Sequence, residues 1–269
     1  MTYFKNKTAI VTGSGMGIGK AIALELCKQG AHVVLNGRNA ERLEKTHQDF
    51  LRDGYNVIAV QADVTRAAEC AELIEKTVAV FGKIDILITN AGISMREHFE
   101  NLEPEIFAQI IESNIHGSAY PALKALPAIK KSKGSIVFIS SAAGMVGLPT
   151  ASAYSAGKMA LTALAQSLKI ELANTGVHIG IVHVGFTRND EDKRVLNAKG
   201  ELIPVARRPA YLQQTQEEVA HAVLYMIRKK KFKSILSFVG KLNALAIRIF
   251  PSLVILIISL SQKRMSKKS

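Results

Sequence analysis

The chain has 269 residues and a formal net charge of +13 at pH 7, from 35 lysines and arginines against 22 acidic residues. Hydrophobic residues make up 48% and charged residues 21%, a globular composition that excludes global disorder and fibrous repeats. The length fits one large α/β domain, or a domain plus a small appendage. Two cysteines, Cys27 and Cys70, make neither a disulfide framework nor a zinc motif, and we expect no metal.

The basic surplus is concentrated at one end of the chain. Glu218 is the last acidic residue, and eleven basic residues follow it. Residues 1–218 therefore carry a net charge of only +2, whereas residues 219–269 carry +11. Such a surplus suits nucleic acid, an anionic membrane or acidic substrates. The polar start Met1–Lys7 lacks the pattern of a signal peptide, so we expect a cytoplasmic location.

Short apolar runs alternate with amphipathic stretches over most of the chain. Strands are expected at Thr8–Val11, His32–Leu35, Val57–Gln61, Ile84–Thr89, Ser135–Ser140 and His178–His183. Helices are expected at Gly19–Gln29, Ala40–Asp53, Arg66–Phe81, Glu103–Ala128, Ala153–Asn174 and Gln216–Ile227. This order predicts an α/β fold with a Rossmann-like, doubly wound parallel sheet. Residues 187–216 break the alternation, which is typical of a mobile active-site lid or a disordered connection.

A glycine cluster, Thr12–Gly19 (TGSGMGIG), directly follows the first expected strand. Glycines permit a tight turn and let a phosphate approach the backbone, and the next helix then presents free N–H groups to a pyrophosphate. A glycine cluster alone could be a flexible turn. Its position between a strand and a helix favours a dinucleotide site.

The second expected strand ends in Leu35-Asn36-Gly37-Arg38-Asn39. A site for NAD usually has an acid here to bind the ribose 2′-hydroxyl, whereas an arginine suits the 2′-phosphate of NADP. The alternative is an exposed arginine that opens the next helix. We expect NADP(H) in preference to NAD(H).

Tyr154 and Lys158 are four residues apart, which places both on one face of a helix. A nearby ammonium lowers the pKa of a phenol, so that tyrosine can exchange a proton. Such a pair also arises by chance on helix surfaces. The catalytic interpretation gains support from Ser140-Ser141, which ends the preceding expected strand.

Together these motifs resemble the classical short-chain dehydrogenase/reductase family over roughly residues 5–230. The resemblance rests on TGSGMGIG, Asn90-Ala91-Gly92, Asn114, Ser141 thirteen residues before Tyr154, and YSAGK. It implies an NADP(H)-dependent oxidoreductase that reduces a ketone or aldehyde, or oxidises the alcohol, by hydride transfer. It also implies a homo-oligomer.

The resemblance assigns a role to each site residue. Tyr154 would be the proton donor or acceptor, Lys158 would bind the nicotinamide ribose, Ser141 would bind the substrate carbonyl, and Asn114 would hold a relay water. The implied cofactor contacts are Gly13, Ser14, Gly17, Ile18, Gly19, Arg38, Asp63, Val64, Asn90, Ala91, Gly92, Tyr154, Lys158, Gly185 and Thr187. Ser140 competes with Ser141 for the catalytic role, and Asn114 could simply satisfy helix backbone.

One segment departs from the family pattern. The family usually has Pro-Gly after the sixth strand and a threonine four residues beyond that glycine. This chain keeps Gly185 but has Val184 in place of the proline and Asn189 in place of the threonine. The contacts on the nicotinamide side are therefore open.

Residues 228–269 form an appendage to a catalytic domain at 1–227. The apolar stretch Leu242–Leu260 contains Arg248 and Pro251, so a kinked helix in the interface of an anionic membrane fits better than a spanning one. An element packed on the enzyme or on a second subunit is the other alternative. Nucleic acid is not expected, because aromatic residues are not interleaved with the basic ones.

This appendage resembles the membrane-associated branch of the family, which implies a hydrophobic lipid-like or steroid-like substrate. The protein would then lie peripherally on the cytoplasmic face of a membrane. A different class also fits the altered Val184–Asn189 segment beside such a tail: a membrane-tethered, cofactor-binding regulatory or scaffold protein with little turnover.

Overall fold

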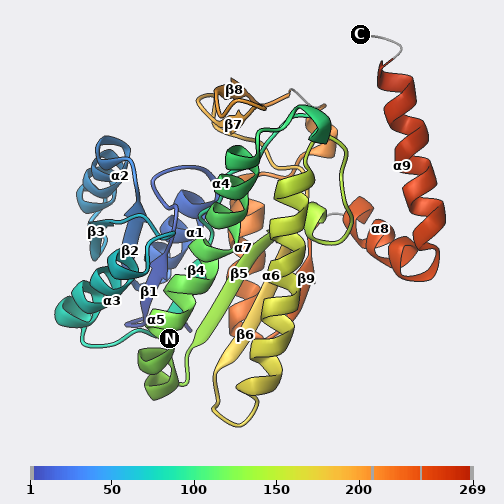
Figure 1. Ribbon diagram of the computed structural model, residues 1–269. Helices are drawn as coiled ribbons and strands as arrows, with labels where there is room; N and C mark the ends of the chain where they lie inside the picture. Colours follow the sequence, from blue (N-terminus) through green and yellow to red (C-terminus); the bar gives the residue numbers. More distant parts are fainter. Residues whose placement is uncertain (1–2, 207–208, 237, 267–269) are drawn as a thin grey trace.

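A seven-stranded parallel sheet forms the centre of the computed structural model, which describes residues 3–206, 209–236 and 238–266 (Figure 1). The strand order is β3-β2-β1-β4-β5-β6-β9. The strands are β1 (Thr8–Val11), β2 (His32–Gly37), β3 (Val57–Gln61), β4 (Ile86–Thr89), β5 (Ser135–Ser141), β6 (His178–Val184) and β9 (Lys233–Ile235). The predicted doubly wound Rossmann-like sheet is confirmed.

Helices cover both faces of this sheet. One face carries α1 (Gly17–Lys28), α2 (Ala40–Arg52) and α7 (Gln216–Arg228). The other carries α3 (Ala67–Phe81), α4 (Pro104–Asn114), α5 (His116–Ser132) and α6 (Ser152–Glu171). Short 3₁₀ turns are η1 (Phe99–Asn101), η2 (Ala142–Gly144) and η3 (Ala210–Leu212).

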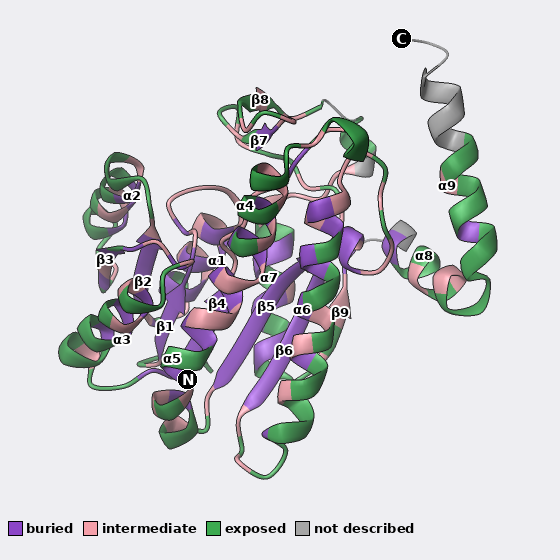
Figure 2. Cartoon of the chain, viewed as in Figure 1, coloured by how far each residue is buried: buried purple, intermediate pink, exposed green. Residues whose placement is uncertain are grey.

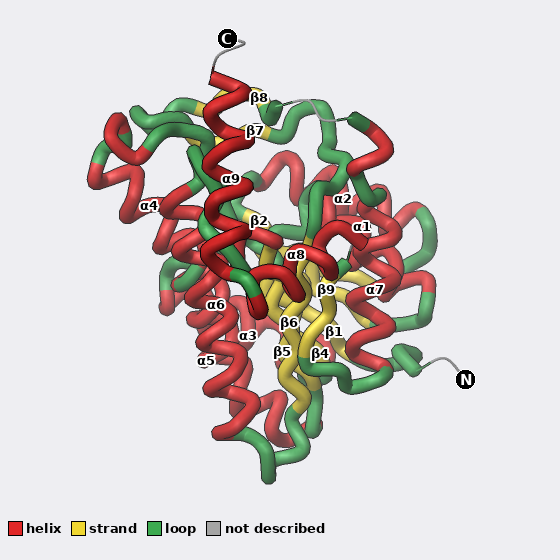
Figure 3. Tube along the Cα trace, turned by 90° about the vertical axis from the view of Figure 1, so that its right-hand side faces the viewer, coloured by secondary structure: helices red, strands yellow, loops and turns green. Residues whose placement is uncertain are grey.

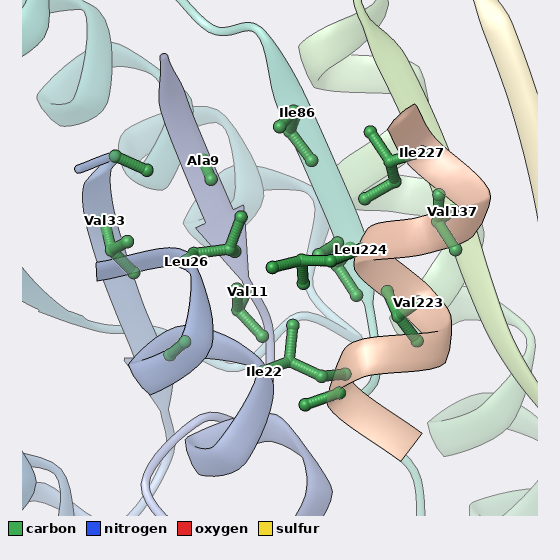
Figure 4. Packing of buried hydrophobic residues seen from close by; sticks show 14 of the residues in the cluster. Ala9, Val11, Ile22, Leu26, Val33, Ile86, Val137, Val223, Leu224 and Ile227 are labelled. Atoms are coloured by element: carbon green, nitrogen blue, oxygen red, sulfur yellow. The ribbon is translucent and has the colours of Figure 1, made fainter. Parts of the chain in front are cut away.

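Alternate strand residues supply two separate cores. In β1, Ala9 and Val11 face α1 and α7, whereas Ile10 belongs to the core on the opposite face. Figure 4 shows Ile22 of α1 and Leu224 of α7 packed over the first of these faces. All five side chains are fully or almost fully buried. Burial on both faces explains why the strands have continuous apolar sequences rather than alternating ones.

The single helix expected at Glu103–Ala128 is two helices in the structure. Helix α4 ends at Asn114 and α5 begins at His116, with Ile115 between them. The apolar spacing continues through this one-residue break, because Ile110 of α4 and Ala122 of α5 both point into the interior. Periodicity alone therefore gives no sign of the break.

The sheet continues beyond residue 227, where the sequence analysis placed the end of the catalytic domain. Residues Lys233–Ile235 form β9, which pairs in parallel with β6. Phe232 and Leu236, on either side of β9, pack into the cores of opposite faces. Lysines on an edge strand are common because they discourage pairing with other chains. Because Lys229–Lys231 precede this strand and Lys233 begins it, the sequence does not show the apolar run that would predict a strand.

The expected lid at 187–216 contains a β-hairpin. Strands β7 (Arg194–Leu196) and β8 (Leu202–Pro204) pair antiparallel. Val195 and Leu196 are buried, so this part of the lid packs on the body. The described part of the lid is thus an ordered covering element.

Two C-terminal helices stand beside the β9 edge of the sheet, α8 (Phe238–Ile249) and α9 (Pro251–Ser266) (Figures 1 and 3). Helix α8 ends at Ile249 and α9 begins at Pro251, where the sequence predicts a kink. Figure 2 shows α9 largely exposed. No helix in the described ranges combines the length and apolar character needed to span a bilayer.

Candidate active site

The strand order reverses between β1 and β4, and the glycine cluster lies at the carboxyl end of β1. In doubly wound sheets this switch point is where ligands bind. Gly13 and Gly17 have φ of +64° and +59°, which side-chain-bearing residues rarely adopt. A Cβ on Gly19 would lie 2.3 Å from the carbonyl oxygen of Gly13. The loop conformation therefore depends on these three glycines.

Asn90 holds the glycine loop from the end of β4. Its Nδ2 donates to the carbonyl oxygens of Thr12 and Gly13 at 3.0 and 3.1 Å. The backbone N–H groups of Asn90 and Ala91 donate to Thr12 Oγ1 at 3.0 and 3.1 Å. The side-chain Nδ2 of Asn90 thus holds the loop in place.

Several predicted cofactor residues have side chains that serve the core. Ser14 is buried and accepts a hydrogen bond from the backbone N–H of Asn36 at 2.9 Å. Val64 belongs to the core on the α3 face, and Ile18 packs against the core on the α1 face. Their contacts with a cofactor would come from backbone atoms.

Arg38 and Asp63 face each other beyond the ends of β2 and β3. Arg38 is half exposed, and its guanidinium lies 3.5 Å from the Asp63 carboxylate. Burial tends to raise the pKa of Asp63, but hydrogen bonds from Thr65 and the Arg38 charge outweigh it and lower the pKa. Asp63 is therefore an anion that orients Arg38 at the margin of the site.

Ser141, Tyr154 and Lys158 come together, as the sequence predicts. Ser141 ends β5 and shares a side-chain hydrogen bond with Tyr154. Tyr154 and Lys158 are one turn apart on α6, and Lys158 Nζ lies 5.7 Å from the centre of the Tyr154 ring. Ser140 is buried and donates to the backbone carbonyl of Lys158 at 3.1 Å. This engagement leaves Ser141 as the serine that faces Tyr154.

The proton chemistry of this group differs from the sequence expectation in one respect. Burial of the phenol raises the pKa of Tyr154 above its ordinary value, and the Ser141 hydrogen bond only partly opposes this. Burial, and then the charge of Lys193, lower the pKa of Lys158 to about 8. The expected lowering of the Tyr154 pKa by Lys158 is absent: Lys158, with a pKa of about 8, has lost its charge before Tyr154 ionises, and desolvation dominates.

Asn114 is fully buried at the end of α4, beside this group. Its Nδ2 donates to the carbonyl oxygens of Ile93 and Ile110 at 2.8 and 2.9 Å. Its Oδ1 is buried without a partner among the described residues. A Cβ on Gly92 would lie 2.7 Å from this oxygen and 3.4 Å from Lys158 Nζ. An unused acceptor so close to an ammonium suits a bound water.

The altered segment begins at the last residue of β6. Val184 is buried in β6 and pairs in register with Ser141. Thr187 Oγ1 donates to the Gly185 carbonyl at 3.4 Å. Asn189 is exposed.

The lid reaches the glycine loop through contacts that the sequence reasoning missed. Asp190 Oδ2 accepts a hydrogen bond from the Gly17 N–H at 2.8 Å. Asp192 forms an ion pair of 2.6 Å with Arg42 of α2. The only signal in the sequence is the charged run RNDEDKR after β6, which does not reveal where it folds back.

An apolar cluster adjoins Tyr154 beneath the lid. Its buried members are Met95, Ile110, Ala153 and Leu196, and Tyr154 packs against them. A cavity of about 460 Å³ opens nearby, lined by Arg96, Glu97, His98, Thr150, Asn197 and Ile203. The site thus combines an apolar floor with a polar rim.

A doubly wound sheet with a glycine loop at its switch point, a serine at the end of β5, and a tyrosine and a lysine on α6 beside it, is typical of a nicotinamide-dependent type of oxidoreductase. Residues 7–199 match the model of the family described as short chain dehydrogenase. The chain belongs to this family of oxidoreductases.

Among similar proteins, 11-beta-hydroxysteroid dehydrogenase 1A of Arabidopsis thaliana is 34% identical over 200 residues, which cover 73% of this chain and 57% of the plant protein. The chain thus spans little more than half the length of this relative. An alcohol dehydrogenase of Thermococcus sibiricus complexed with 5-hydroxy-NADP is 27% identical, with a TM-score of 0.73 over 86% of this chain and 95% of that one. A short chain dehydrogenase/reductase of Burkholderia phymatum in complex with NAD shares the fold, with a TM-score of 0.82, 22% identity and coverage of 94% and 96%.

The residues of the site fit a nicotinamide dinucleotide. The glycine loop leads into α1, whose N-terminal N–H groups suit a phosphate, although that of Gly17 donates to Asp190 in this structure. The unpartnered Oδ1 of Asn114 and the ammonium of Lys158 provide an acceptor and a donor near the reacting end. Arg38 provides a charge at the adenosine end.

Proposed function

We propose that the protein is an NADP(H)-dependent oxidoreductase that reduces a ketone or aldehyde, or oxidises the corresponding alcohol. The observation that carries this proposal is the convergence of Ser141, Tyr154 and Lys158 beside Asn114 at the carboxyl edge of the sheet. A bound nicotinamide ring supplies or accepts the hydride.

The chain's own residues handle the carbonyl oxygen and its proton. Ser141 and Tyr154 donate hydrogen bonds to this oxygen, which stabilise the negative charge that develops on it. Tyr154 then gives up its proton as a general acid. The phenol is protonated at neutral pH, the form that donates a proton in reduction, and burial raises its pKa further. Lys158 and a water on Asn114 Oδ1 return a proton to Tyr154.

Arg38 supports the preference for NADP(H). Asn36 and Gly37 end β2 without an acid, and Arg38 follows with a half-exposed guanidinium. A guanidinium binds a phosphate through paired donors. Similar structures carry NAD in one case and an NADP derivative in another, so the family fold accommodates both.

The substrate in this proposal is hydrophobic and lipid-like or steroid-like. The apolar cluster of Met95, Ile110, Ala153 and Leu196 reaches Tyr154, and such a surface favours an apolar ligand around its reacting carbonyl. The name of the plant relative, a hydroxysteroid dehydrogenase, points to the same class.

The proposal also places the protein on the cytoplasmic face of an anionic membrane, through α8 and α9. These helices expose a row of large apolar side chains: Leu242, Leu245, Ile249, Phe250, Leu253, Ile255, Leu256, Ile257 and Leu260. At the base of α8, Lys231, Lys233 and Lys241 line a hollow of about 470 Å³. Apolar side chains beside basic ones are the combination that binds the interface of anionic lipids.

Flotation with phosphatidylserine vesicles tests the membrane part. Full-length protein should float with the vesicles, and a protein ending at Leu236 should stay at the bottom of the gradient. Loss of flotation in vesicles of neutral lipid would confirm the charge contribution. Full-length protein that fails to float with either lipid would refute the membrane location.

The activity is tested by NADPH oxidation against a panel of apolar and water-soluble carbonyl compounds. Consumption of NADPH with at least one apolar ketone is expected. Binding of NADPH without oxidation by any panel member would instead support a cofactor-binding regulatory or scaffold protein.

A further inference from the structure

The lid places a carboxylate in the part of the site that should receive the cofactor's pyrophosphate. Asp190 Oδ2 accepts from the N–H of Gly17, the first residue of α1, at 2.8 Å. Its other oxygen, Oδ1, accepts from Gln216 Nε2 at 2.8 Å. Both oxygens of Asp190 are therefore engaged, one by the glycine loop and one by the start of α7.

Helix α1 has no acidic residue of its own in its first turn. Met16 supplies no side-chain cap. The N–H groups of a helix N-terminus carry partial positive charge and attract anions. Asp190, 173 residues further along the chain, satisfies one of these groups.

Further contacts join this part of the lid to the glycine loop and to α2. Asp192 pairs with Arg42 at 2.6 Å, and Arg42 Nη1 also lies 3.1 Å from Met16 Sδ in the glycine loop. Lys193 is close enough to influence Lys158, whose pKa its charge helps to lower. The segment 190–193 thus extends from the pyrophosphate end of the site toward the catalytic lysine.

We infer that Asp190 sets the cofactor affinity of this protein, because its carboxylate occupies the pyrophosphate position at the start of α1 and must leave before a dinucleotide binds. The inference rests on the proposed dinucleotide-dependent function. A pyrophosphate and a carboxylate repel each other and compete for the same N–H groups. Each cofactor molecule that binds therefore breaks the hydrogen bond between Asp190 and Gly17.

The test compares Asp190→Ala with Glu191→Ala. Glu191 is the adjacent, exposed residue of the same lid, so its replacement makes a similar change in charge without touching the glycine loop. Titration with NADPH should show a dissociation constant about tenfold lower for Asp190→Ala. The variant lacks the one charge-assisted hydrogen bond, from Gly17 to Asp190, that stabilises the cofactor-free form. Glu191→Ala should stay within about twofold of the parent on the same grounds.

A second readout needs no cofactor. Hydrogen exchange of the Gly17 amide should be slow in the cofactor-free parent and in Glu191→Ala, and fast in Asp190→Ala. NADPH binding that is unchanged or weaker in Asp190→Ala would overturn the inference while leaving the proposed function intact. Failure of the parent and both variants to bind NADPH or NADH would refute the proposed function, and the inference with it.

Discussion

The molecule has two regions that differ in how they place their apolar side chains. One is the sheet with its covering helices, here called the body, and the other is the helix pair α8–α9. The body buries its apolar strands on both faces, and residues 1–236, which include β9, carry a net charge of +7. Helices α8 and α9 expose most of their large apolar side chains, and no acidic residue follows Glu218. In the described residues they pack on each other and make no comparable contact with a helix or strand of the body. In the proposed function, the chemistry belongs to the body and the membrane location to α8 and α9.

The largest expected effect comes from a substitution that abolishes carbonyl reduction and leaves vesicle binding unchanged. Tyr154→Phe should lower the rate of carbonyl reduction by about 10³-fold, because the general acid is lost. Its vesicle binding and its circular dichroism spectrum should match the parent. A variant as active as the parent would show that Tyr154 does not transfer the proton.

Two substitutions on α9 should have the opposite result, with weaker vesicle binding and unchanged reduction activity. Leu256→Asp combined with Ile257→Asp should weaken vesicle binding by about a hundredfold, since two apolar side chains of roughly 1.5 kcal/mol or more each no longer enter the lipid. Reduction of a water-soluble ketone should be unaffected.

Leu123→Asp provides the matched control on the body, because Leu123 is an exposed leucine of α5. It should float like the parent. Equal loss of flotation in this control would show that exposed apolar residues in general, rather than α9, bind the vesicles.

Within the body, Arg38 tests which cofactor the site prefers. Arg38→Asp should weaken NADPH binding by about 30-fold, the equivalent of the ~2 kcal/mol of a charge-assisted hydrogen bond. NADH binding should change by no more than about threefold, since NADH has no 2′-phosphate for Arg38 to contact.

Arg52→Asp, on the exposed last turn of α2, controls for the general loss of positive charge. A parent protein that prefers NADH, with no change in Arg38→Asp, would contradict the assignment of Arg38 to the 2′-phosphate.

The smallest effect is a pH dependence. The pKa of Lys158 is lowered to about 8, so its charge is present below that pH and disappears above it. If the charged form binds the cofactor ribose, as the proposed function requires, NADPH binding should weaken by about tenfold between pH 7 and pH 9. Isothermal titration across this range measures it. In Lys158→Met the dependence should be absent, and a slope that persists there would have to come from another group.

The sequence predicted the structure best for strands that are buried on both faces and for side chains that belong to a motif. The six predicted strands are recovered, because continuous apolar runs with both faces covered are hard to place elsewhere. The motif also brought Ser141, Tyr154 and Lys158 together correctly, and the side-chain direction of Ser140 follows from alternation along β5.

Local patterns did not reveal features set by distant contacts. The strand β9 is only three residues long and is flanked by lysines, so its pairing with β6 is decided by Phe232 and Leu236 meeting the two cores. The contact of Asp190 with Gly17 joins residues 173 apart. The raised pKa of Tyr154 depends on the burial of its hydroxyl, which spacing along a helix does not show.

The central claim is that the body carries the reductase activity and that α8 and α9 carry the membrane binding. Two proteins and two substrates test it most directly. The full chain and a protein ending at Leu236 are assayed with NADPH on a water-soluble ketone and on a lipid ketone held in phosphatidylserine vesicles. The two proteins should reduce the soluble ketone at equal rates, and the full chain should reduce the vesicle-held ketone about tenfold faster, because interfacial binding concentrates it at the substrate. Equal rates on the vesicle-held ketone, or loss of both activities in the shorter protein, would contradict this claim.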